Sequence, residues 1–294
     1  MTIAVSILPD QQLAALNEVY RKAVARKRLR VALGAAAFLA ALAIASIGAE
    51  VNLRTLFTYF GHFVSYFDRL LTLDNGSRVW TNIPEWLWGW KKWSLLLGET
   101  ILISYVGTLF GAVLGFAFNF LAAENTSPGP WVRFIVKRLM EFCRTVPDIV
   151  FALIFVIAFG LGPMAGVLAI TIHSIGALGK QYAEMVENID MKPVEGLRST
   201  GAGWIACMRF AVLPQVVAGF ASYTLLRFEI NVRSASVMGF VGAGGIGVEL
   251  ITAIRKFYYS DVSAILLLII LTVFVIDIGT GWVRGRLFGK ERRT

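Results

Sequence analysis

The sequence predicts an all-α integral membrane protein with about six transmembrane helices, and three observations support this fold class. Of the 294 residues, 57% are hydrophobic. Only 16% are charged, against about 25% in ordinary soluble proteins. Several long stretches are apolar and carry almost no charge, as expected of helices that have hydrocarbon as their solvent. This composition excludes a disordered chain and a typical cytosolic enzyme, and no nucleic acid is expected among the partners.

The six expected spans differ in length and in polarity. The segment before the first span holds six basic residues, and no small-residue cleavage pattern follows it, so we expect a retained helix rather than a cleaved signal. Several stretches fall short of the roughly 20 apolar residues that a span needs, so neighbouring helices must complete them. The spans are expected at residues 31–47, 94–122, 149–161, 163–178, 216–234 and 262–283.

The distribution of Lys and Arg predicts the orientation, because these residues concentrate on the cytoplasmic side of a membrane. With both termini in the cytoplasm, the inner segments hold 19 of the 28 basic residues and the outer segments hold seven. The inner segments are 1–30, 123–148, 179–215 and 284–294, and the outer ones are 48–93 and 235–261. Arg227 and Arg233 are the remaining two, and both lie inside the fifth expected span.

The chain is expected to have three parts. Residues 1–93 form a cytoplasmic segment, a first helix and an outer loop, residues 94–284 form the membrane core, and residues 285–294 form a basic tail. The outer loop holds five tryptophans, which predict an anchoring belt at the membrane surface, with ligand stacking as the alternative. They are Trp80, Trp86, Trp88, Trp90 and Trp93. The role of the segment 48–93 is left open.

The inner loop at residues 181–215 is too polar to span and has helical periodicity. Apolar residues recur in it at three- and four-residue steps, and Pro193 suits the first turn of a helix. Gly201 and Gly203 interrupt the pattern, so we expect two short amphipathic helices joined by a glycine turn and ended by Leu213-Pro214. The alternative is a helix that lies on the bilayer surface.

The same loop resembles a motif of importer permeases of the ATP-binding-cassette class. That motif reads Glu-Ala-Ala, three residues, Gly, nine residues, then Ile-x-Leu-Pro. Here Glu195-Gly196-Leu197 is followed by Gly201 and by Ala211-Val212-Leu213-Pro214, with every spacing matched. The departures, Gly196, Leu197 and Ala211, are all small or apolar. Further runs are similar to phosphonate importer permeases, and the resemblance covers about residues 95–285. These runs are residues 140–144, 150–155, 160–169, 225–236 and 241–247.

The resemblance implies a function and a set of partners. It implies a core of five helices plus an N-terminal helix in the inner membrane of a prokaryote. A cytoplasmic ATPase dimer that binds ATP and Mg²⁺ would dock on the loop 181–215, and an external substrate-binding protein would deliver phosphonate or phosphite. A second copy of the chain would complete a homodimer, and this chain would hold no cofactor. The docking residues are expected to be Glu195, Gly201, Trp204, Leu213 and Pro214. The alternatives are a permease for another solute such as methionine, and a transporter driven by an ion gradient.

Polar residues inside the fifth span are candidates for the translocation pathway. Charges at membrane depth are costly and face a cavity or a partner. Arg227 and Asn231 are four residues apart, as are Glu229 and Arg233, so each pair shares a helix face. The excess of arginine suits an oxyanion, whereas the alternative is a structural Glu229–Arg233 ion pair. Ser234 completes the candidate set.

A second group of candidates lies at the inner entrance of the third span and within the fourth. Glu141 and Arg144 are three residues apart, so they are expected to pair as an interfacial salt bridge or to line a gate together with Asp148. His173 lies in the fourth span, where a histidine is either a packed residue or part of a pathway.

Two motifs that resemble nucleotide sites are not expected to bind nucleotides. Residues 242–247 match G-x-G-x-x-G, but an apolar span rather than a strand precedes them, so a close-packed bend near the outer mouth is the better interpretation. Lys180 follows Gly179 without the remainder of a phosphate-binding loop. No nucleophile or metal-ligand pattern is evident, so the chain is not expected to be an enzyme.

Overall fold

The computed structural model describes residues 10–50 and 52–291 of the chain. Within these ranges the structure is helical, and its only β-type pairing is an isolated bridge between Thr72 and Arg78. The prediction of an all-α protein is therefore confirmed. The chain divides into two units, with the boundary between Tyr66 and Phe67, so residues 67–93 belong to the same unit as the membrane core.

The first unit holds the long helix α1, Asp10–Gly48, and most of α2, Leu53–Leu70. Residues Asn17–Gly48 of α1 are long and apolar enough to cross a membrane, and the expected span 31–47 lies among them. The part of the expected basic segment at residues 1–9 lies outside the described residues.

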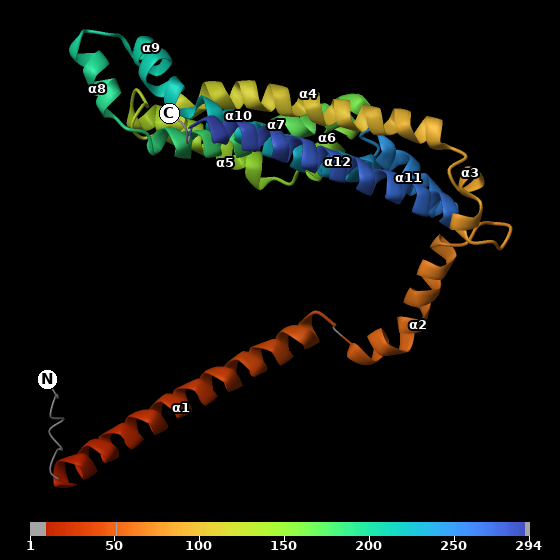
Figure 1. Ribbon diagram of the computed structural model, residues 1–294, viewed down its shortest axis with the longest axis horizontal. Helices are drawn as coiled ribbons and strands as arrows, with labels where there is room; N and C mark the ends of the chain where they lie inside the picture. The colour runs from red at the N-terminus through yellow and green to blue at the C-terminus, as the bar shows by residue number, and fades with distance from the viewer. Residues whose placement is uncertain (1–9, 51, 292–294) are drawn as a thin grey trace, which may run out of the picture. The chain divides into compact units, whose positions relative to one another are not determined.

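The second unit is a helical bundle with α7 in contact with four of its helices (Figure 1). α7 packs against α4, α5, α6 and α10. The short elements of this unit include η1 (Val79–Thr81), α3 (Ile83–Trp86) and η3 (Gly239–Val241). The main helices are α4 (Trp90–Ala122), α5 (Pro130–Thr145), α6 (Asp148–Phe159), α7 (Pro163–Glu187), α10 (Leu213–Met238), α11 (Ile246–Arg255) and α12 (Tyr259–Glu291).

Glycines allow α4 and α7 to approach closely. A Cβ atom added at Gly107 would lie 2.6 Å from Ile170 Cγ2, and one at Gly111 would lie 2.4 Å from Ser174 Cβ. Gly176 is equally tight on the other side of α7, because its added Cβ would lie 2.5 Å from the Met140 carbonyl oxygen of α5. Small residues at helix contacts are how membrane bundles gain packing where no hydrophobic driving force acts between helices.

The number of spanning helices differs from the six expected. Among the described residues, four helices are long and apolar enough to cross a membrane, or five if α5 and α6 form one broken span bent by 85°. The expected span 149–161 is α6, which has only 12 residues. The expected span 163–178 is the first part of α7, a 25-residue helix that continues into a charged end. Neighbouring helices cover α7, so it does not need a continuous apolar surface.

Proline accounts for the break between α5 and α6, and glycines account for a bend just before α11. Pro147 disfavours helical geometry at Val146, where α5 ends, and a new helix begins at Asp148. Between η3 and α11, Gly242, Gly244 and Gly245 have positive φ angles. They bend the chain so that the Gly245 and Ile246 amides donate to Glu99 Oε1 (3.3 Å) and Thr100 Oγ1 (2.9 Å) on α4. The G-x-G-x-x-G run is thus a close-packed turn.

The tryptophans of the outer segment do not all form a belt. Trp93 is buried, with 1% of its surface exposed. The Trp86 indole donates to Ser260 O (3.2 Å) and Ser263 Oγ (3.0 Å) of α12. The Trp88 indole donates to Asp261 Oδ1 (2.9 Å). The segment therefore packs on the start of α12, and only exposed rings such as Trp80 and Trp90 remain available to a membrane surface.

Replacing Gly176 by Ala is expected to destabilise the bundle by about 1–3 kcal/mol, the usual cost of overpacking. The added methyl would meet backbone atoms of α5, which cannot rotate away. Thermal unfolding of the purified protein in detergent measures the effect. Gly279→Ala in α12, where nothing lies within 4 Å of the added Cβ, is the matched control. Equal melting temperatures for the two variants would show that this contact is not tight.

Candidate functional site

The inner loop folds as two short helices joined by a glycine turn, as the sequence predicts. α8 covers Lys192–Ser199 with Pro193 in its first turn, and α9 covers Trp204–Cys207. Gly201 between them has a φ of +83°, a left-handed conformation that residues with a side chain rarely adopt. In Figure 1, α8 and α9 lie at one end of the second unit, where α12 also ends, and α3 lies at the other end.

The second helix of this loop does not end at Leu213-Pro214 as expected. The chain continues through a π-helical turn, η2 (Met208–Val212), directly into α10. The Leu213 amide donates to the Met208 carbonyl five residues earlier. Pro214 has no amide hydrogen and sits in the first turn of α10, where none is required. The loop is thus joined to the span by a helical rather than a flexible connection.

The loop presents one side to the bundle and the other to the exterior of the fold. Val194, Cys207 and Met208 are buried in a core cluster together with residues of α4, α5, α7 and α10. Glu195 is exposed in the first turn of α8, where a carboxylate suits the helix dipole. Among the expected docking residues, Gly201 and Pro214 are also exposed and Leu213 is half-buried. The Trp204 indole instead donates to the Thr126 carbonyl at 2.7 Å.

Asn231 is the centre of a polar cluster inside the bundle. It is completely buried, and its Nδ2 donates to Thr108 Oγ1 on α4 (2.8 Å) and to Ser174 Oγ on α7 (2.9 Å). Ser104 Oγ donates to the Asn231 backbone carbonyl at 3.2 Å. These bonds join three helices at one point. The other polar atom of this side chain, Asn231 Oδ1, has no hydrogen-bond partner in the structure.

Arg227 lies one helical turn before Asn231 on α10. Both side chains contact α7, as expected for residues that share a helix face. The Arg227 guanidinium contacts Ser174 Oγ (3.4 Å) and the ring nitrogen Nδ1 of His173. The Asp148 carboxylate, at the start of α6, interacts electrostatically with both Arg227 and His173. Arg227 and His173, from two different helices, therefore contact each other within the electrostatic range of Asp148, which begins a third helix.

Glu229 and Arg233 form an ion pair on the other face of α10. Glu229 is 5% exposed, and it also interacts with Arg284 (3.5 Å) and Thr280 (3.4 Å) of α12. Arg233 is more accessible, with 51% of its side chain exposed. Glu229 therefore attaches α10 to α12. The guanidinium group of Arg233 has further N–H donors besides the one that bonds Glu229. Ser234 is half-buried on the same helix.

The expected Glu141–Arg144 pair is not formed. Glu141 pairs with Arg138 instead, one turn earlier on α5. Arg144 lies at the end of α5, where its Nε is buried without a partner in the structure. Both side chains border a cavity with Lys137, Lys180 and Glu184. A three-residue spacing permits either pair, and the tertiary position of Arg144 decides against the expected one.

Several site residues were not anticipated from the sequence. Thr108 and Ser104 lie on an expected span whose one charged residue is Glu99, and small hydroxyl residues give little signal there, although their four-residue spacing places them on one face. Arg284 and Thr280 lie near the end of α12. The sequence of α12 alone does not indicate that they contact Glu229 of α10. Thr126 contributes only its backbone carbonyl, which leaves no trace in the sequence.

Comparisons with known proteins cover the regions that hold these residues. The family model described as a binding-protein-dependent transport system inner membrane component matches residues 107–289. The phosphite transport system permease protein PtxC of Stutzerimonas stutzeri is 41% identical over 196 residues, which is 67% of this chain and 71% of that protein. The phosphate-import permease protein PhnE of Mycolicibacterium smegmatis is 42% identical over 179 residues, 61% of this chain and 34% of PhnE.

Solved structures agree with the fold. A chain of the MetNI methionine ABC transporter in an inward-facing conformation superposes with a TM-score of 0.57 at 19% identity, over 66% of this chain and 95% of that one. This likeness concerns the fold alone. The family match extends from the middle of α4 into the last turn of α12 and includes the α8–α9 loop, Thr108, Ser174 and Asn231. The chain belongs to the family of binding-protein-dependent transport system inner membrane components.

Proposed function

We propose that this chain is the transmembrane subunit of an ATP-driven importer whose pathway carries phosphonate or a related phosphorus oxyanion such as phosphite. The observation that carries the substrate class is the 41% identity to a phosphite transport permease over 67% of the chain. The methionine transporter is similar at only 19% identity, and therefore supports the architecture rather than the solute.

The α8–α9 loop is the docking element for a cytoplasmic ATPase dimer. Its exposed face includes Glu195 and Gly201, and its buried face is fixed to the bundle. With this loop in the cytoplasm, the proposal puts both termini there as well, and the excess of basic residues in the segments assigned to that side supports this topology. ATP and Mg²⁺ bind to the ATPase subunits and not to this chain.

The polar cluster supplies the electrostatics that an oxyanion requires. Arg227, Arg233 and Arg284 bring three guanidinium groups to α10 and its neighbours, against the two carboxylates of Glu229 and Asp148. Guanidinium forks match the oxygen geometry of phosphorus oxyanions, and they stay charged at every physiological pH. The proposal also counts Glu141, Arg144 and Ser234 among the candidate pathway residues.

The transport cycle follows from these two elements. An external binding protein delivers the solute to a pathway lined by two copies of the chain around a twofold axis. Closure of the ATPase dimer displaces the docking loops as rigid bodies, which opens the pathway outward. Hydrolysis returns the loops, and the solute leaves toward the cytoplasm.

Uptake into proteoliposomes tests the proposal directly. The complete complex, reconstituted with its ATPase and binding protein, is expected to accumulate phosphite or methylphosphonate only when ATP is present on the ATPase side. Uptake of methionine with no uptake of either phosphorus compound would overturn the substrate class. Uptake driven by a proton or sodium gradient without ATP would overturn the mechanism.

Gly201→Val is expected to uncouple hydrolysis from transport. A β-branched residue at a φ of +83° is strained by about 1–3 kcal/mol, so the α8–α9 turn must change shape. We expect uptake per ATP hydrolysed to fall about tenfold, since each 1.4 kcal/mol corresponds to a factor of ten. Gly76→Val is the control, because Gly76 has a φ of +80° in the outer segment. An equal loss in both variants would indicate general instability rather than coupling.

Arg233→Ala is expected to impair uptake while the complex still assembles. Glu229 keeps Arg284 and Thr280 as partners, so no buried charge is left isolated. The measurements are the yield of assembled complex and the initial rate of phosphite uptake, with Arg284→Ala as the comparison. Loss of the assembled complex in Arg233→Ala would instead support a purely structural ion pair.

A further inference from the structure

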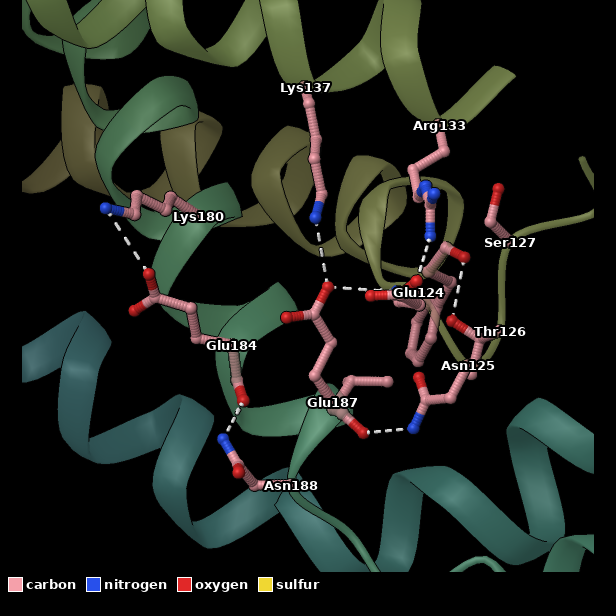
Figure 2. A network of polar contacts seen from close by, with 12 residues as sticks. Glu124, Asn125, Thr126, Ser127, Arg133, Lys137, Lys180, Glu184, Glu187 and Asn188 are labelled. Atoms are coloured by element: carbon pink, nitrogen blue, oxygen red, sulfur yellow. Dashed lines mark hydrogen bonds and ion pairs between the residues drawn. The ribbon is translucent and has the colours of Figure 1, made fainter. Parts of the chain in front are cut away.

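The turn between α4 and α5, residues 124–127, lies against the end of α7 (Figure 2). The Glu124 amide donates to Glu187 Oε1 at 3.0 Å, and Asn125 Nδ2 donates to the Val186 carbonyl at 2.7 Å. Thr126 is 1% exposed, and its hydroxyl donates to the Phe120 carbonyl at 2.9 Å. The turn is thus a fixed part of the bundle rather than a loose connection.

Charged residues attach α5 to the same turn. Glu187 also accepts from Lys137 Nζ at 3.1 Å, and Arg133 pairs with Glu124 at 2.8 Å (Figure 2). The hydrogen bond from Arg133, followed by its charge, holds the pKa of Glu124 below its ordinary value, so this carboxylate is ionised at neutral pH. The carboxylate of Glu187 therefore contacts both the turn and α5.

The α8–α9 loop contacts this turn from the other side. The Trp204 indole donates to the Thr126 carbonyl at 2.7 Å, and the Asn125 amide lies 3.4 Å from Met191 Sδ just before α8. Covalently, the loop continues only into α7 and α10. Its contacts with the turn add α4 and α5, and α5 leads to the bend at which Asp148 begins α6.

We infer that the 124–127 turn is a second link between the docking loop and the membrane helices, with Trp204 and Glu187 as its positioning residues. This inference rests on the proposed function and extends it. A displacement of α8 and α9 then moves α4 and α5 together with α7 and α10. A buried carbonyl without its donor is costly, so the loop and the turn stay bonded and move as one body through the cycle.

Trp204→Phe tests the link because it removes the indole N–H and keeps an aromatic ring. In the reconstituted complex we expect normal assembly and an ATPase rate within about twofold of wild type, with phosphite uptake per ATP reduced at least fivefold, or about 1 kcal/mol of coupling. Trp131→Phe, at a tryptophan of α5 that is 77% exposed, is the matched control. Equal uptake-to-hydrolysis ratios in the two variants would overturn the inference.

Spin labels measure the same link without perturbing it. Labels at Ser127→Cys and Ser199→Cys report the distance between the turn and α8, and the native Cys143 and Cys207 are buried. We expect the distance in the otherwise wild-type complex to be the same in the nucleotide-free and ATP-trapped states. A change of about 5 Å, one helical turn, would overturn the inference. If the Trp204→Phe complex does not assemble, this distance measurement tests the inference in its place.

The two proposals fail in different ways. If the wild-type complex shows no ATP-dependent uptake of any solute, the proposed function is wrong. If the wild-type complex transports and Trp204→Phe transports equally well, the proposed function stands and the second link is wrong.

Discussion

Hydrocarbon offers no hydrogen bonds, so a polar group inside this bundle is costly unless it finds a partner within the protein, and several of these partners lie on other helices. That constraint determines where α10 lies. Asn231 is bonded to Thr108 of α4 and Ser174 of α7, and Glu229 is held by Arg284 of α12. Each contact is specific, because shifting α10 by one residue would leave a buried amide or a buried charge unpaired. The close approach of α4 and α7 at their glycines brings the hydroxyl groups within reach.

The α8–α9 loop, the proposed docking element, follows the opposite principle, because one of its faces stays exposed on the surface of the fold. Its inner face packs through Val194 and Met208, whereas Glu195 stays exposed beside a left-handed glycine. The helical connection through η2 into α10 means that the loop cannot move without the span. One continuous helical element therefore connects the polar residues of α10 to the surface proposed to bind the ATPase.

The sequence predicts those parts of this structure that depend on neighbours along the chain. Hydropathy and periodicity predict the helices, the glycine turn at Gly201 and the shared faces of Arg227 with Asn231 and of Glu229 with Arg233. Hydropathy and periodicity do not predict which side chains on different helices contact each other. Glu141 has two basic neighbours at equal spacing, and only the position of Arg144 in the fold leaves Arg138 as its partner. The break between α5 and α6 is local, because Pro147 is visible in the sequence, but the 85° angle between the two helices depends on α7, against which both pack.

The most direct test of this account is which side of the membrane α8 faces and what it touches there. Ser199→Cys lies at the exposed end of α8 and can be reacted with a membrane-impermeant thiol reagent. The account predicts labelling in inside-out vesicles and none in sealed right-side-out vesicles. It also predicts protection of this site, and crosslinking through it, when the ATPase is bound. Labelling from the outer medium, or crosslinks to lipid alone in the working complex, would contradict it.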